Sequence, residues 1–169
     1  MKAITIADWL GPYAEHPAAQ ATVIRQHGAQ LLAAVNEFLQ CAEDDGVDVS
    51  DAKISGSGNG GFRPPDCAVG TKFSAHKDGR AVDIEDIGQN LAEWALGDGR
   101  AHAERLGLYF EHPQWTRSWL HAQIGAPKSG NRFFVPYADL LASPPTCGPL
   151  DGQREAGVTI FNPSAPRPA

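Results

Sequence analysis

The clearest repeat of apolar positions lies between Pro17 and Gly46, where such residues recur at steps of seven, four, three and four. The repeating residues are Ile24, Leu31, Val35, Phe38 and Ala42. Polar residues stand between them, and this spacing is typical of one face of an amphipathic helix. Pro17 suits the first helical turn and Gly46 suits a stop, so we expect a long helix over this segment.

Shorter patterns after this segment predict strands and two short helices. The strand candidates are "DAKISGSG" (51–58), "RAVDI" (80–84), "LGLYFEH" (106–112) and "RSWLHAQIG" (117–125). In the last of them Trp119, His121 and Gln123 alternate with Leu120, Ala122 and Ile124, as in a strand with one buried face and one face toward a site. "QNLAEWAL" and "RAHAERLG" predict short helices on either side of "GDG". The order predicts an α+β domain, with a small antiparallel sheet and the long helix packed behind it.

The end of the chain has a different composition. From Ser143 onward there are six prolines and little periodicity, and only "GVTIF" suits a docked strand. We therefore expect one domain over residues 1–142, a length that can bury a single core, followed by a proline-rich tail over 143–169.

Charge and cysteine content narrow the partners. The chain has 14 Lys and Arg against 20 Asp and Glu, with no block of like charges, so neither nucleic acid nor an anionic membrane is an expected partner. Three separated cysteines, Cys41, Cys67 and Cys147, form neither a disulfide framework nor a C-x-x-C pair. No signal-peptide pattern or membrane-length apolar run is present. The expectation is a monomer made in the cytoplasm.

Candidate chemistry lies in "SAHKDGRAVDI" (74–84). His76 precedes a turn at Asp78-Gly79, and Asp83 lies on the strand that follows, so the two side chains can converge. Imidazole nitrogen and carboxylate oxygen are zinc ligands, and a catalytic zinc site needs three protein ligands. His121, on a neighbouring strand, is the best placed third ligand. The alternatives are a loop histidine, a strand-end hydrogen-bonding aspartate and a core histidine.

The loop "GSGNGGFRPP" (56–65) precedes these residues. It is not expected to hold a phosphate, because no G-K-[ST] follows and Pro64-Pro65 prevents a helix from starting there. Taken together, "GSGNGGFRPP", "SAHKDGRAVDI", "LYFEH" and "SWLHAQ" resemble the zinc peptidases of bacterial cell-wall peptides. These are the D-alanyl-D-alanine carboxypeptidases and dipeptidases and the phage L-alanyl-D-glutamate endolysins, whose fold is shared by the Hedgehog signalling domain. The central element, matched at Ser74, His76, Gly79, Ala81 and Asp83, is the specific one, and the resemblance covers about residues 50–125.

The resemblance implies a role for each matched position. His76, Asp83 and His121 are the implied Zn²⁺ ligands, and Arg63 corresponds to the arginine that binds a substrate oxygen or the developing oxyanion. Ser74 matches a residue near the substrate. Gln123, on the same strand face as His121, is expected to hydrogen-bond the substrate or to fix a ligand.

The general base departs from the commonest pattern. Many members have a glutamate three residues before the last zinc histidine, or a histidine two before, and this chain has Ser118 and Trp119 there. Hedgehog-type members carry a glutamate at the end of the preceding strand, and Glu111 in "LYFE" resembles it. Glu111 is therefore the expected base and His112 the second choice; the alternative is a solvated pair at a strand end.

The resemblance implies hydrolysis of a peptide bond in peptidoglycan stem peptides or cross-links, by a metallopeptidase of the phage-lysis type that is released to the wall or carried by a virion. The alternative is a non-catalytic, zinc-stabilised module of the same fold. The bond that is cleaved does not follow from the sequence.

Overall fold

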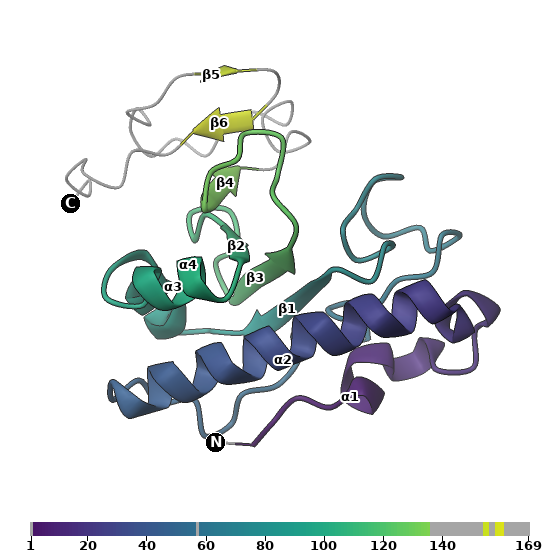
Figure 1. The fold of residues 1–169 in the computed structure, drawn as a ribbon, viewed down its shortest axis with the longest axis horizontal. Helices are drawn as coiled ribbons and strands as arrows, with labels where there is room; N and C mark the ends of the chain where they lie inside the picture. The colour runs from purple at the N-terminus through teal and green to yellow at the C-terminus, as the bar shows by residue number, and fades with distance from the viewer. Residues whose placement is uncertain (1, 57, 136–153, 156–157, 161–169) are drawn as a thin grey trace.

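The computed structural model describes residues 2–56, 58–135, 154–155 and 158–160 and has the expected α+β architecture. Its α-helices are α1 (Ile6–Leu10), α2 (Thr22–Asp44), α3 (Asn90–Leu96) and α4 (Arg100–Arg105), and Gly11–Tyr13 and Pro17–Gln20 are short 3₁₀ helices. Its strands are β1 (Ala81–Glu85), β2 (Leu108–Glu111), β3 (Trp119–Ile124), β4 (Phe133–Val135), β5 (Arg154–Glu155) and β6 (Val158–Ile160). Helix α2 lies along one face of the sheet (Figure 1).

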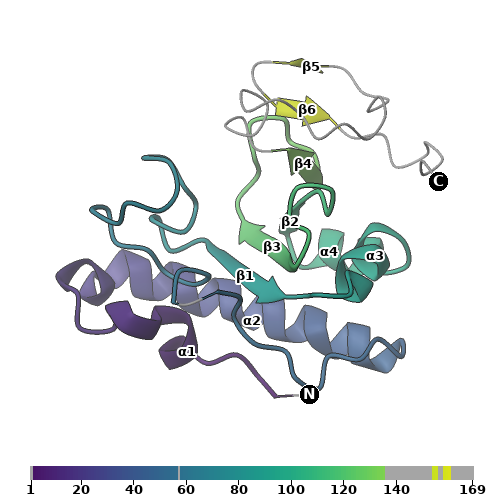
Figure 2. The ribbon, with the colours of Figure 1, turned by 180° about the vertical axis from the view of Figure 1, so that it is seen from behind.

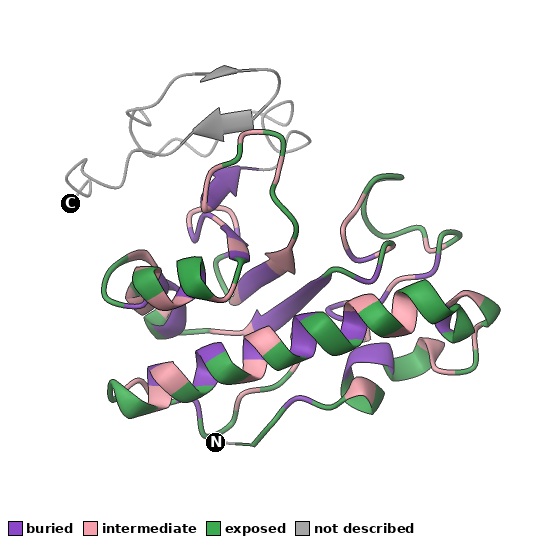
Figure 3. Ribbon diagram, in the orientation of Figure 1, coloured by how far each residue is buried: buried purple, intermediate pink, exposed green. Residues whose placement is uncertain are grey.

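The predicted long helix is confirmed in its centre and is shorter at its start. Pro17–Gln20 forms a 3₁₀ turn, and Ala21 has an extended backbone (ψ 130°) that separates the turn from α2. Past the other end, Gly46 has φ +88°, a conformation that favours glycine. The buried stripe of α2 faces the sheet (Figure 3) and includes Leu31, Val35, Phe38 and Ala42. Phe38 contacts Phe110 of β2, with ring centroids 5.1 Å apart.

The sheet is mixed, and the expectation of an antiparallel sheet is wrong at one strand pair. The strand order is β1-β3-β2-β4-β6-β5. β3 pairs antiparallel with β1 and with β2, but β2 pairs parallel with β4. The three apolar residues of β4 are too few to show a pattern in the sequence, and this strand was not predicted. The expected strand at 51–58 is reduced to one isolated bridge, between Ile54 and Ile84.

The N-terminal helix α1 was also not predicted, and it adds Trp9 and Leu10 to the core. A capping box between Thr5 and Asp8 starts it. Trp9, 1% exposed, donates a hydrogen bond from Nε1 to the carbonyl oxygen of Ala81 in β1. Its ring lies so close to α2 that a Cβ on Gly28 would be 2.5 Å from it. Glycine at position 28 therefore lets α1 pack under the start of β1.

The glycine-rich loop is built for close approach between backbones. A Cβ on Gly61 would lie 1.9 Å from the carbonyl oxygen of Trp9, and one on Gly60 would lie 2.2 Å from that of Ser55. The backbone of Asp83 bonds this loop on both sides, because its N–H donates to Gly60 and its carbonyl accepts from Ser55. The chain leading into β1 therefore covers the outer edge of that strand, as the view from behind shows (Figure 2).

The expected tail falls mostly outside the described residues, as does its predicted boundary at residue 142. Within it, "GVTIF" does contain a strand, since β6 pairs antiparallel with β4 and β5 pairs with β6. In the described part of the chain, no helix combines the length and the apolar character that a membrane span needs.

Candidate metal centre

Two strands and one loop place the candidate ligands on the sheet face opposite α2. Asp83 of β1 is directly opposite His121 of β3 in the antiparallel register, so both side chains point to the same face. His76 comes from the loop before β1, where the turn closed by Gly79 (φ +73°) brings the chain back. All three residues are buried, with exposures of 3% for His76, 8% for Asp83 and 5% for His121.

The ligand atoms of these residues form a small triangle. His76 Nε2 lies 3.3 Å from His121 Nδ1 and 3.3 Å from Asp83 Oδ1, and His121 Nδ1 lies 2.8 Å from Asp83 Oδ1. Ligands that bind zinc at roughly 2.0–2.1 Å at tetrahedral corners stand roughly 3.3 Å apart. Two edges already have this length and the third needs to lengthen by a few tenths of an ångström. The triangle therefore fits one face of a tetrahedral metal site.

The outward-facing ring nitrogens of both histidines meet oxygen acceptors. His76 Nδ1 lies 2.7 Å from the carbonyl oxygen of Gly61, which can only accept, so Nδ1 carries the proton and Nε2 turns its lone pair inward. His121 Nε2 lies 3.3 Å from Gln123 Oε1, and the Gln123 amide nitrogen donates in turn to the carbonyl oxygen of Gly125. Partners of this kind fix the tautomer and direction of metal-binding histidines.

Arg63 forms an ion pair with the second carboxylate oxygen of Asp83. Its Nη2 donates to Asp83 Oδ2 at 2.9 Å, and its Nε donates to the carbonyl oxygen of Asn59. Both side chains of the pair are nearly buried, at 11% and 12% exposure. The arginine thereby leaves only Oδ1 to face the two histidines. Sequence reasoning placed Arg63 at the substrate; in this structure its guanidinium is committed to a candidate ligand.

The pKa values of the two histidines are shifted in opposite directions. Burial lowers the pKa of His76, and the nearby Asp83 only partly offsets this. Burial also disfavours a charged His121, but Glu111 and Asp83 outweigh it and raise the pKa to about 9. Burial disfavours the charged form of Asp83 as well, yet His76 and His121 hold the pKa of that carboxyl well below its usual range. Without a metal, His121 is therefore the charged histidine of the cluster, with its Nδ1 proton directed at Asp83 Oδ1 and its Nε2 proton at Gln123 Oε1.

Glu111 stands beside the cluster on the next strand. Tyr109 is opposite Gln123 and Phe110 is opposite Ala122, and one further step in this register sets Glu111 beside His121. Glu111 is half-buried, and its charge is the largest influence that favours protonated His121. Strand alternation turns His112 to the other face, where its Nδ1 accepts from the N–H of Gln114. The structure thus brings Glu111, and not His112, to the three candidate ligands.

The remaining predicted residues lie around this centre. Ser74 and Arg63 meet above Gly70, since a Cβ there would be 3.3 Å from Ser74 Oγ and 3.1 Å from Arg63 Nη1. Gln123 contacts His121 as described, which agrees with a ligand-fixing role. Among the described residues, His76, Asp83 and His121 are the group whose donor atoms converge closely enough for a metal, all lying within 4.8 Å of one another.

The role of Gly61 was missed from the sequence, because a backbone acceptor for a histidine depends on a loop conformation that no spacing reveals.

The chain was compared with protein-family models, with curated proteins and with solved structures, and none of them matches it.

Proposed function

We propose that this protein is a zinc-dependent hydrolase of peptide bonds in bacterial peptidoglycan, acting on stem peptides or cross-links. The observation that carries the metal part is the buried triangle of His76, Asp83 and His121, in which each ligand has an outer hydrogen-bonding partner. The substrate class rests on the sequence resemblance to cell-wall zinc peptidases. The same resemblance is the basis for the proposed route to the wall, which is release by a phage-type lysis system or delivery with a virion.

Each residue has a distinct task in the proposed reaction. His76, Asp83 and His121 hold the ion, which when bound lowers the pKa of water toward neutrality and polarises a carbonyl group. Glu111 accepts the proton of the attacking water and passes it to the leaving amine, so the peptide C–N bond breaks as a C–O bond forms. Arg63 holds Asp83 in its one-oxygen orientation, and its Nη1, which has no hydrogen bond among the described residues, is the donor left for a substrate oxygen.

The first experiment measures metal content. The full chain, purified without chelator, is expected to hold one equivalent of zinc, and His76→Ala and His121→Ala are each expected to lose it. His27→Ala is the matched control, because His27 lies on α2 and bonds only the carbonyl oxygen of Asp78 and Arg80 among the described residues. Undiminished zinc in both cluster variants would rule out this site.

The second experiment measures catalysis. Glu111→Gln removes the carboxylate without changing its size, so the zinc content is expected to stay and the release of amines from purified cell walls is expected to fall by about 10²-fold or more. Mass spectrometry of the digest would name the bond. If Glu111→Gln cleaves walls as fast as the unmodified chain, Glu111 is not the base.

A second candidate is a zinc-stabilised module without catalysis, and one observation favours it. The three ligands are at most 8% exposed, as in closed structural sites, and no acid or histidine occupies position 118 or 119. Full zinc occupancy without amine release from any wall preparation would select this alternative.

A further inference from the structure

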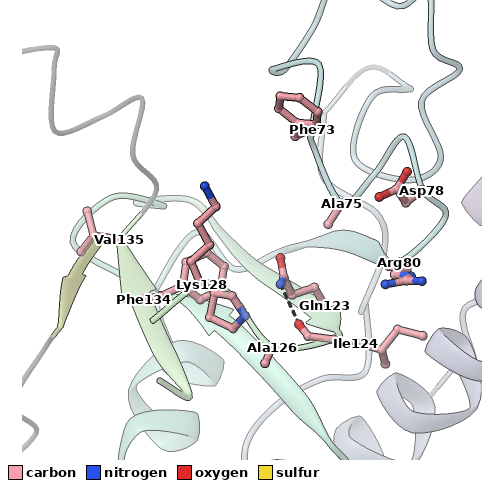
Figure 4. A pocket seen from close by; sticks show the side chains of 12 residues that line it. Phe73, Ala75, Asp78, Arg80, Gln123, Ile124, Ala126, Lys128, Phe134 and Val135 are labelled. Atoms are coloured by element: carbon pink, nitrogen blue, oxygen red, sulfur yellow. Dashed lines mark hydrogen bonds between the residues drawn. The ribbon is translucent and has the colours of Figure 1, made fainter. Parts of the chain in front are cut away.

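A pocket of about 330 Å³ opens next to the candidate metal centre. One wall is the loop before β1, with Phe73 and Arg80, and the other is the turn after β3, with Lys128 (Figure 4). Gln123 and Phe134 line it between these walls. The pocket is thus framed by the same loop that supplies His76 and the same strand that supplies His121.

Two side chains connect the pocket to the metal centre. Gln123 lines the pocket while its Oε1 lies 3.3 Å from His121 Nε2. Phe134 also lines it, and its ring meets the ring of His121 edge-on at 6.2 Å between centroids. A ligand that reaches the metal centre along this face therefore places its neighbouring group in the pocket.

The pocket contains two cationic side chains and one acidic side chain. Arg80 and Lys128 line it, together with Asp78. Neither cation forms an ion pair within the described ranges, although the chain as a whole carries a net charge of −6. Within the described part of the chain, the Arg80 guanidinium has one polar side-chain contact, at 3.5 Å from His27 Nε2. Two cations on facing walls beside an amide suit a carboxylate, which arginine can bind through two donors.

The apolar part of the lining suits a peptide more than a small free anion. Phe73 is 86% exposed, an unusual position for a phenylalanine, and Phe134 and Val135 lie across the pocket from it (Figure 4). An aromatic wall binds the aliphatic part of a ligand whose charged end meets Arg80 and Lys128.

We infer that this pocket is a subsite for a free carboxylate carried by the peptide substrate, next to the residue that is held at the metal centre. The inference rests on the proposed function, which supplies the identity of the substrate as a stem peptide. It adds that the preferred stem peptides carry a free carboxylate on the residue next to the one at the metal centre. An amidated peptide is expected to bind less well.

The test compares two probes that differ in one group. The peptide L-Ala-γ-D-Glu-L-Lys and its form with the glutamyl α-carboxylate amidated are titrated into the zinc-loaded full chain by calorimetry. The acid is expected to bind about tenfold more tightly, as for one charged hydrogen-bonded contact. Where a peptide is cleaved, the ratio of kcat/KM values replaces the ratio of Kd values.

The double variant Arg80→Ala/Lys128→Ala is expected to lose this preference while it keeps zinc and Tm. Lys2→Ala/Arg100→Ala removes the same charge away from the pocket and is expected to keep the preference. Equal binding of the two probes to the unmodified chain, absence of binding of both, or a preference that survives in the pocket variant would overturn the subsite. Preference without any wall hydrolysis would contradict the proposed function and leave the subsite standing.

Discussion

Replacing Arg63 separates two roles for this side chain. The family resemblance implies contact with a substrate oxygen, whereas the structure shows an ion pair with Asp83 at 2.9 Å and a second anchor on the carbonyl oxygen of Asn59. If the ion pair is the main role, Arg63→Ala should weaken the site before any substrate is present. If the substrate contact is the main role, the variant should bind zinc normally and lose only catalysis.

The size of the first effect follows from burial. The two side chains are 11% and 12% exposed, so water screens the pair little, and removal of one partner from such a pair typically costs about 3–5 kcal/mol. We expect the lower end, about 3 kcal/mol in the unfolding free energy of the metal-free protein, because protonated His121 still faces Asp83. Loss of an outer partner of a metal ligand lowers metal affinity by about 10–100-fold, and we expect a loss in this range.

The assay is chelator competition for zinc combined with urea unfolding in excess chelator. Arg63→Lys serves as the graded control, since one ammonium can reach either Asp83 or Asn59 but does not replace the two-point fork. Its zinc affinity is expected to lie between those of the parent and Arg63→Ala. Unchanged zinc affinity and unfolding free energy in Arg63→Ala would refute the positioning role.

Three shorter predictions follow from other contacts. Gly61→Ala should destabilise the fold by about 3 kcal/mol or more, because its Cβ would lie 1.9 Å from the Trp9 carbonyl oxygen. Gly97→Ala is the control and should change Tm little, because its Cβ would lie 3.6 Å from the nearest atom. Similar melting curves for the two variants would contradict this prediction. In the metal-free protein the pKa of His121 is raised from 6.5 to about 9, so its contribution to stability is complete below pH 6.5 and is lost as the pH rises through 9. Urea titrations in chelator should show a decrease on the order of 3 kcal/mol over that window, and a flat or rising profile would count against it. Glu111→Gln should lower the pKa of His121, measured by NMR of the ring protons of the metal-free chain; an unchanged pKa would mean that the carboxylate lies elsewhere.

Much of the local structure could be predicted because it depends on periodicity. The face of α2 through Leu31, Val35 and Phe38, and the alternation through β3, are properties of adjacent residues in one segment. The convergence of His76, Asp83 and His121 was also expected, but from an ordered set of motifs and not from any single spacing.

Other features could not be predicted from the sequence, because they depend on packing between distant segments. The parallel pairing of β4 with β2 is settled by the return path of the chain, and three apolar residues carry no sign of it. Helix α1 has only five residues, and its stability comes from burying Trp9 against Gly28. The sequence placed the glycines at 60 and 61 in a loop that is not expected to hold a phosphate, but the contacts with Trp9 and Ser55 that require glycine there could not be predicted from it.

The position of Glu111, the proposed base, shows why the spacing around His121 is a poor guide to where a base can lie. A base placed near the last ligand in sequence must lie on the same strand, and positions 118 and 119 hold Ser and Trp. In this sheet the row of side chains across three strands runs from Asp83 through His121 and continues to Glu111. Adjacent strands are about 4.8 Å apart, closer than the next same-face residue along one strand at about 6.6 Å. A carboxylate ten residues away in sequence therefore stands nearer the ligand than a local one would, and the order β1-β3-β2 is the feature on which the proposed catalysis depends.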